Sequence, residues 1–160
     1  MSSTNFQKDP NGQSHLGEIA ARNGIALTAQ ARKVLAEEAI QFVNHRVPCI
    51  VHIASVNFAE AIELAKHAEA VGADAISAIP PMFFAYDVND VYNYYKAIAE
   101  AVSIPLIVYY NPNAGFNMNA GIAAKMFEIE NRATDLYLLS LKKPQECGLE
   151  YKANLVKTEC

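Results

Sequence analysis

IPLIVYYNP, residues 104–112, predicts a buried β-strand that ends at a proline turn. Its apolar and β-branched centre is typical of a strand in a parallel sheet, and a proline cannot continue the ladder of hydrogen bonds. The strand carries Tyr109 and Tyr110 to its C-terminal end, where sites usually form in α/β proteins. A phenol fixed there can pass protons to and from a substrate. The stretch therefore brings candidate proton-transfer groups to the functional end of a sheet.

Three other strand-like runs share the chain with amphipathic stretches that lie between them. We expect strands at residues 48–53, 74–79 and 135–141, and helices at 28–44, 57–71, 87–102 and 119–128. Thr28 suits the start of the first helix, and Gly72 suits the end of the second. Strand starts recur at intervals of roughly 26–31 residues, which matches a strand plus a crossover helix. The pattern predicts successive βα units and a parallel sheet covered by helices.

The length of the chain decides between two architectures built from this unit. A complete eight-stranded barrel needs about 200 residues or more, and the chain has 160. We expect an α/β fold, a partial (β/α)8 barrel of four to five βα units, with residues 28–142 as its core. Residues 1–27 are expected to be irregular, and residues 143–160 to form a peripheral tail. An open sheet of flavodoxin type is the alternative, but the sequence lacks the Gly-rich phosphate loop that this fold would use.

Composition excludes several classes of protein. The formal net charge of -4 argues against binding to nucleic acid, and the 52% hydrophobic residues indicate a folded globular chain. The longest apolar runs are strand-sized, so no membrane span is expected. Cys49, Cys147 and Cys160 form an odd set without metal-ligand spacing. This set favours unpaired thiols in a reducing, cytoplasmic compartment.

Residues 27–130 resemble the pyruvate-dependent class I aldolases, the family that includes N-acetylneuraminate lyase and dihydrodipicolinate synthase. The resemblance is carried by residues 51–74, by IPPMFF at 79–84 and by VYYNP at 108–112. It implies a (β/α)8 barrel that forms a homo-oligomer, uses no metal or organic cofactor and acts on pyruvate or another 2-oxo acid. The implied reaction makes or breaks a C–C bond while the ketone is held as a Schiff base on a lysine. Such an iminium accepts the electrons of the carbanion.

The same resemblance implies roles for individual residues. Tyr109 is similar to the catalytic tyrosine that shuttles the proton, and Ser14 to a hydroxyl of the turn that holds the pyruvate carboxylate. Gly115 resembles the glycine that begins the substrate loop. Lys142 resembles the lysine that forms the Schiff base. Lys143 is an alternative nucleophile, and a third interpretation makes both lysines a solvated strand end.

Two departures from the family pattern leave two functional hypotheses open. Phe83 and Phe84 stand where the family has tyrosines, one of which joins a proton relay across a subunit contact, and phenylalanine has no hydroxyl. Strands one, seven and eight of the family barrel have no counterpart, as expected for a truncated relative. The chain is therefore either an active lyase or a catalytically inactive barrel fragment that binds oxo acids weakly or serves in assembly.

Overall fold

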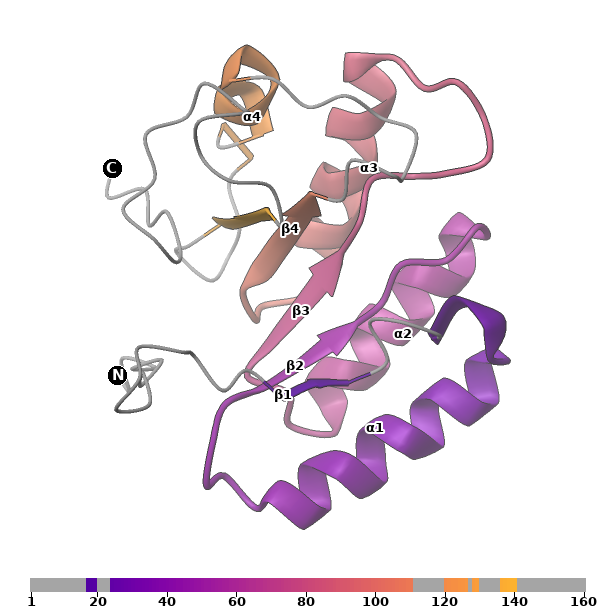
Figure 1. The fold of residues 1–160 in the computed structure, drawn as a ribbon, viewed down its shortest axis with the longest axis vertical. Coiled ribbons are helices and arrows are strands. Elements are labelled where there is room, and N and C mark those ends of the chain that lie inside the picture. Colours follow the sequence, from indigo (N-terminus) through magenta and orange to yellow (C-terminus); the bar gives the residue numbers. More distant parts are fainter. Residues whose placement is uncertain (1–16, 20–23, 111–119, 127, 130–135, 141–160) are drawn as a thin grey trace.

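One parallel sheet organises the chain in the computed structural model, which describes residues 17–19, 24–110, 120–126, 128–129 and 136–140. Its five strands are adjacent in the order in which they occur in the sequence (Figure 1). They are β1 (Gly17–Ile19), β2 (Cys49–His52), β3 (Ala75–Ala78), β4 (Leu106–Tyr110) and β5 (Leu136–Ser140). In a doubly wound sheet the strand order reverses, so sequential order rules out the flavodoxin-type alternative. The predicted partial barrel of four to five βα units is confirmed.

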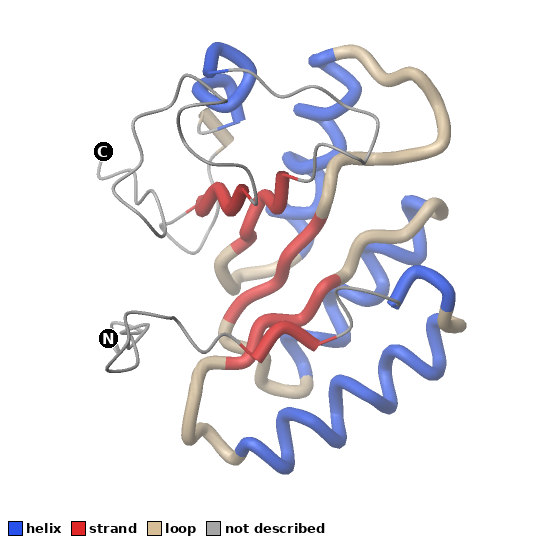
Figure 2. The backbone as a smooth tube through the Cα atoms, in the orientation of Figure 1, coloured by secondary structure: helices blue, strands red, loops and turns tan. Residues whose placement is uncertain are grey.

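Helices connect the strands and follow the same order along the sheet (Figure 2). They are α1 (Ala29–Val43), α2 (Phe58–Ala70), α3 (Val88–Ala101) and α4 (Ala120–Met126), and a short 3-10 helix, η1 (Gly24–Ala26), precedes α1. Crossovers between parallel strands are right-handed, so a sheet wound in one direction carries its helices on one face. Neighbouring helices α1 and α2, and α2 and α3, also pack on each other.

Local sequence signals explain where the helices begin and end. Thr28 caps α1, since its side chain accepts a hydrogen bond from the backbone N–H of Ala31 at 3.2 Å. Asp87 and Asp90 form a capping box at the start of α3, each accepting from the other's backbone N–H. Gly72 follows α2 with φ of 90°, a conformation that only glycine adopts without strain. The helix boundaries predicted from the sequence are confirmed to within two residues.

The core lies between the sheet and its helices. Its largest fully buried members include Tyr95 and Ile98 from α3 and Ile76, Leu106 and Val108 from the strands. Val51, Ile76 and Leu106 are lateral neighbours on β2, β3 and β4 and all belong to this core. Successive side chains along a strand point to opposite faces. In each strand, the residues directly before and after these three therefore lie on the other face of the sheet.

The N-terminal segment differs from the prediction. Residues 1–27 were expected to be irregular, but residues 17–19 form β1 and residues 24–26 form η1. β1 pairs in parallel with β2, and Gly17 lies opposite Cys49. Three residues are too short to show the alternation that reveals a strand. The neighbouring β2 provides the hydrogen bonds of the sheet that make this segment a strand.

Candidate functional site

The C-terminal end of β4 carries Tyr109, the tyrosine singled out by the sequence. Tyr109 is half-buried and lies opposite Leu139 of β5 in the parallel register. Leu106 and Val108 point into the helix-covered core, so Ile107 and Tyr109 project from the other face of the sheet. In a barrel that face is the interior. The position of Tyr109 is therefore one from which a barrel enzyme reaches its substrate.

Two buried polar side chains share this face with Tyr109. His52 on β2 and Ser77 on β3 are lateral neighbours, with 2% and 1% of their surface exposed. His52 Nδ1 and Ser77 Oγ are 3.0 Å apart, within hydrogen-bond distance. The His52 ring also meets the Tyr109 ring edge to face, with 6.2 Å between centroids. Three adjacent strands thus place an imidazole, a hydroxyl and a phenol on one face of the sheet.

The imidazole of His52 is neutral at physiological pH. Burial, together with the positive charge of Arg32, lowers the pKa of His52 to about 4. A neutral imidazole both donates and accepts hydrogen bonds, so it can hold Ser77 and present its ring to Tyr109. Its low pKa makes it a poor proton acceptor near pH 7, which leaves Tyr109 as the stronger candidate for proton transfer.

A buried arginine ties α1 to the C-terminal end of β2. Arg32 has 4% of its surface exposed, and it donates to the carbonyl oxygens of Ala54 at 2.9 Å and His52 at 2.7 Å. Burial lowers the pKa of Arg32, and the nearby Glu60 carboxylate opposes that shift. Glu60 in turn accepts a hydrogen bond from Ser55 at 3.1 Å. Arg32 thus joins α1 to two backbone carbonyls at the C-terminal end of β2.

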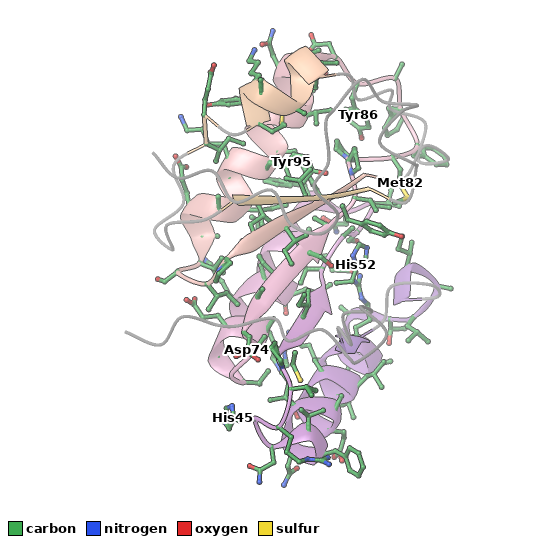
Figure 3. The ribbon with its side chains drawn as sticks, turned by 60° about the vertical axis from the view of Figure 1, so that its left-hand side comes forward. His45, His52, Asp74, Met82, Tyr86 and Tyr95 are labelled. Atoms are coloured by element: carbon green, nitrogen blue, oxygen red, sulfur yellow. The ribbon has the colours of Figure 1, made fainter. Side chains whose placement is uncertain are left out.

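The two ends of the sheet differ in character (Figure 3). His52 lies within the body of the molecule, and Met82 and Tyr86 lie beyond the C-terminal end of β3. At the opposite end, Asp74 accepts a hydrogen bond from the backbone N–H of Cys49 at 2.7 Å and joins β2 to the start of β3. The Asp74 contact thus links two strands at one end of the sheet, and Tyr109 lies at the other end.

The structure describes one of the four site residues predicted from the sequence. Tyr109 is described, whereas Ser14, Gly115 and Lys142 lie outside the described residues, as does the alternative Lys143. The roles of those residues remain predictions.

Sequence reasoning treated His52 only as a core or strand-face histidine and did not consider Ser77. The signal that could have found them is the register. Parallel pairing of the runs 49–52, 75–78 and 106–110 places His52, Ser77 and Ile107 side by side. Tyr109 stands two residues further along β4 on the same face.

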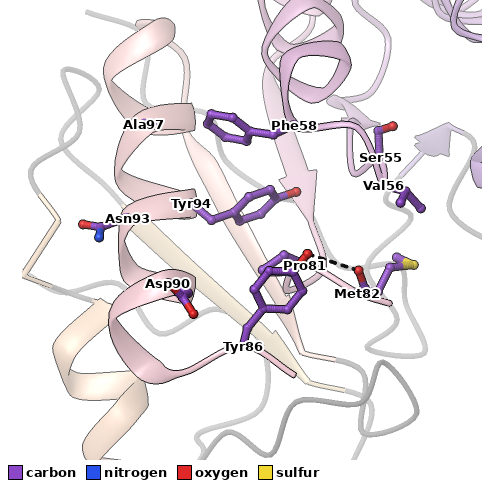
Figure 4. A pocket seen from close by; sticks show the side chains of 10 residues that line it. All are labelled: Ser55, Val56, Phe58, Pro81, Met82, Tyr86, Asp90, Asn93, Tyr94 and Ala97. Carbon is purple, nitrogen blue, oxygen red and sulfur yellow. Dashed lines mark hydrogen bonds between the residues drawn. The ribbon is translucent and has the colours of Figure 1, made fainter. Parts of the chain in front are cut away.

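A separate pocket opens on the helix side of the sheet (Figure 4). It has a volume of about 440 Å³ and lies between α2, α3 and the segments that follow β2 and β3. Its wall consists of ten residues: Ser55, Val56, Phe58, Pro81, Met82, Tyr86, Asp90, Asn93, Tyr94 and Ala97. Tyr109, His52 and Ser77 are not among them, because they lie on the other face of the sheet.

In the part of the chain that the structure describes, no three His, Cys, Asp or Glu side chains gather closely enough to hold a metal ion. None of its helices has the length and apolar character needed to cross a membrane.

A parallel sheet whose strands lie side by side in sequence order, each followed by a helix on one face, is the architecture of the βα-barrel class. Comparison with known proteins gives the family. The sequence matches the Dihydrodipicolinate synthetase family over residues 23–134. The chain belongs to this family, as the resemblance predicted.

Three relatives illustrate the match. N-acetylneuraminate lyase of Clostridium perfringens is 36% identical over 120 residues, which are 71% of this chain and 42% of the relative. CdNal of Clostridium difficile, solved in complex with mannosamine, superposes with a TM-score of 0.70 at 30% identity, over 76% of this chain and 42% of the other. The dihydrodipicolinate synthase of Acinetobacter baumannii, complexed with pyruvate, superposes with a TM-score of 0.70 at 30% identity, over 78% of this chain and 44% of the other. The chain therefore spans less than half the length of these relatives.

Proposed function

We propose that the chain takes part in Schiff-base lyase or aldolase chemistry on pyruvate or a related 2-oxo acid. The observation that carries this proposal is the placement of Tyr109 at the C-terminal end of β4, on the face expected to line a barrel, beside the neutral His52. Family membership supports the reaction class. The pyruvate bound to the Acinetobacter relative supports the substrate class.

The proposed chemistry assigns one role to each candidate residue. The Lys142 amine attacks the ketone of the 2-oxo acid and forms an iminium, with loss of water. When the C–C bond breaks, its electron pair moves into the iminium and leaves an enamine. Tyr109 accepts the proton of the substrate hydroxyl during cleavage and returns it in the condensation direction. Ser14 and Gly115 would contact the substrate. The Ser14 hydroxyl would contact the carboxylate of the 2-oxo acid.

The register of the sheet places the C-terminal ends of β4 and β5 side by side. Tyr109 lies opposite Leu139, and Tyr110 lies opposite Ser140 at the end of β5. Lys142 follows Ser140 by two positions in the sequence. Adjacent parallel strands end at the same edge of a sheet, so this register supports a lysine that follows β5 in the sequence, Lys142 or the alternative Lys143, as the partner of Tyr109.

Borohydride trapping tests the proposal. We expect incubation with pyruvate and sodium borohydride to add a reduced pyruvyl group to Lys142, located by peptide mass spectrometry. Lys142→Arg should abolish the adduct, and Lys143→Arg should leave it. Tyr109→Phe should keep the adduct but lose cleavage of N-acetylneuraminate, because only the proton transfer is removed. An adduct on Lys143 would move the nucleophile by one residue, and no adduct on any lysine would refute the proposal.

A specific observation favours a second candidate, a catalytically inactive barrel portion that acts in assembly. Phe83 and Phe84 are 84% and 69% exposed, and their rings meet edge to face with 5.2 Å between centroids. Exposed aromatic pairs are common anchors of protein interfaces. This candidate predicts a homo-oligomer that Phe83→Ser with Phe84→Ser dissociates in light scattering, together with a melting temperature that pyruvate does not shift.

A further inference from the structure

We propose that the pocket between α2 and α3 is a second ligand site, specific for a small, uncharged aromatic carboxamide or a molecule of the same shape and polarity. It is distinct from the Tyr109 site, since it opens on the helix side of the sheet. Its volume of about 440 Å³ falls within the range of pockets that hold small molecules.

The walls favour an aromatic body. Phe58 from α2 and Tyr94 from α3 lie with ring centroids 5.7 Å apart at an angle of 51°. Tyr86 and Met82 complete the apolar wall, and the Tyr86 hydroxyl donates to the Met82 carbonyl at 3.5 Å. Aromatic rings prefer tilted and edge-to-face partners, and a methionine sulfur also packs well on ring edges. A single planar ring satisfies this set better than a flexible polar chain.

One buried polar atom in the wall lacks a partner. The side chain of Tyr94 has 8% of its surface exposed, and its hydroxyl makes no hydrogen bond. Figure 4 shows this hydroxyl projecting toward the space bounded by Ser55, Pro81 and Met82. Burial raises the pKa of Tyr94 well above its ordinary value, so the phenol stays protonated and acts as a donor. An unpaired buried hydroxyl is costly, and a carbonyl oxygen on a ligand is the acceptor it lacks.

The shielding of that hydroxyl sets a condition on the ligand. Its oxygen is covered in the empty pocket, so solvent does not supply the missing partner. A ligand must displace a side chain of the wall slightly to reach the Tyr94 hydroxyl. Met82 is partly exposed and has three rotatable bonds, which makes it the member of the wall best able to move. A narrow carbonyl group meets this condition more easily than a branched or strongly hydrated one.

The surrounding charges favour an uncharged head group. Asp90 lies at the rim of the pocket, where its Oδ2 accepts from the Asp87 backbone N–H at 3.1 Å. Its negative charge, with that of Glu60 behind Ser55, opposes a carboxylate ligand. On the other side, the Arg32 charge is felt at Tyr94 and opposes a cation. An amide offers a carbonyl to Tyr94 and N–H donors to Asp90 or Asn93. Because it is uncharged, it is repelled neither by the carboxylates nor by Arg32.

Benzamide is a suitable probe for this site. Chemical-shift perturbation of the full chain should show saturable binding confined to the pocket residues, with a dissociation constant of about 1 mM for so small a ligand. Benzoate and benzylamine carry the same ring with a negative and a positive head, and both should bind several-fold more weakly. Tighter binding of either charged analogue would overturn the assignment of an uncharged ligand.

Two variants locate the site. Tyr94→Phe should weaken benzamide binding about 5- to 10-fold, the loss expected for one hydrogen bond, and leave toluene binding unchanged. Ala97→Phe places a ring inside the pocket and should abolish binding of both compounds. Tyr94→Phe removes one oxygen atom only, so this variant still tests the proposal if Ala97→Phe does not fold. Perturbations centred elsewhere, or equal affinity of Tyr94→Phe and the unaltered chain for benzamide, would refute the site.

Discussion

At the scale of the residue, the chain shows how burial changes the chemistry of polar side chains. Arg32, His52 and Ser77 are buried in the structure. Each is hydrogen-bonded, and the arginine donates to two backbone carbonyls at the C-terminal end of β2. The sequence shows that these residues are polar. It does not show that they are buried, because burial depends on which strands become neighbours.

His52 makes stability depend on pH. Its pKa is about 4 in the folded chain and about 6.5 when unfolded. The unfolded chain therefore binds more protons between these values, so the free energy of unfolding falls as the pH drops from about 6.5 to 4. The loss should reach about 3 kcal/mol, since each pKa unit is about 1.4 kcal/mol. Urea denaturation at stepped pH measures it. His52→Gln should flatten the curve over this interval, and an unchanged slope in that variant would contradict the assignment.

Tyr94 and Tyr95 provide a matched pair of adjacent buried tyrosines. The Tyr95 hydroxyl donates to the Ala78 carbonyl at 3.2 Å, whereas the Tyr94 hydroxyl has no partner. Tyr95→Phe should lower the free energy of unfolding by about 1 kcal/mol, and Tyr94→Phe should leave it unchanged or raise it. Chemical denaturation of both variants makes the comparison. Equal losses would mean that the Tyr94 hydroxyl is satisfied after all.

At the scale of the element, local signals account for the helices. Thr28, which the sequence predicted at the start of the first helix, caps α1, and Asn57 and Asp87 cap α2 and α3 in the same way. The strands were visible as short apolar runs. β1 was not, because a strand of three residues at the edge of the sheet has too little pattern of its own.

Gly72 tests the stop signal of α2. Its φ of 90° lies in the left-handed region, and a Cβ added there would meet no atom within 4 Å. Gly72→Ala should therefore cost about 1 kcal/mol through backbone strain alone, while Gly72→Asn, which tolerates this conformation better, should cost less. Thermal denaturation distinguishes the two variants. Equal costs would indicate that lost space, and not strain, decides this position.

At the scale of the whole molecule, the sheet is the element on which both sites depend. It places Tyr109 on one face and the helices that form the second pocket on the other. A change in either site should therefore leave the other intact unless the sheet itself is disturbed. This independence allows the failure of the Schiff-base proposal to be separated from the failure of the pocket proposal.

Hydrogen exchange should show that the middle of the sheet is the most stable part. The backbone N–H of Ile53 donates to Ser77 at 2.8 Å and that of Ile76 to Pro105 at 2.9 Å, and both residues are fully buried. These amides should exchange only through global unfolding. The amide of Leu27, bonded to Gly24 in η1 and part of an exposed residue, should exchange far sooner. Similar rates for Ile76 and Leu27 would show that the sheet does not unfold last.

The sequence by itself determined the succession of βα units, the helix ends and the family, because these depend on patterns within short stretches of the chain. It also singled out Tyr109 through its place at the end of an apolar run. Only the tertiary structure decided that His52 and Ser77 lie beside each other and that the Tyr94 hydroxyl is left without a partner. These features depend on residues that are distant in sequence. Lateral strand pairing and helix packing bring such residues together, and no local pattern encodes either.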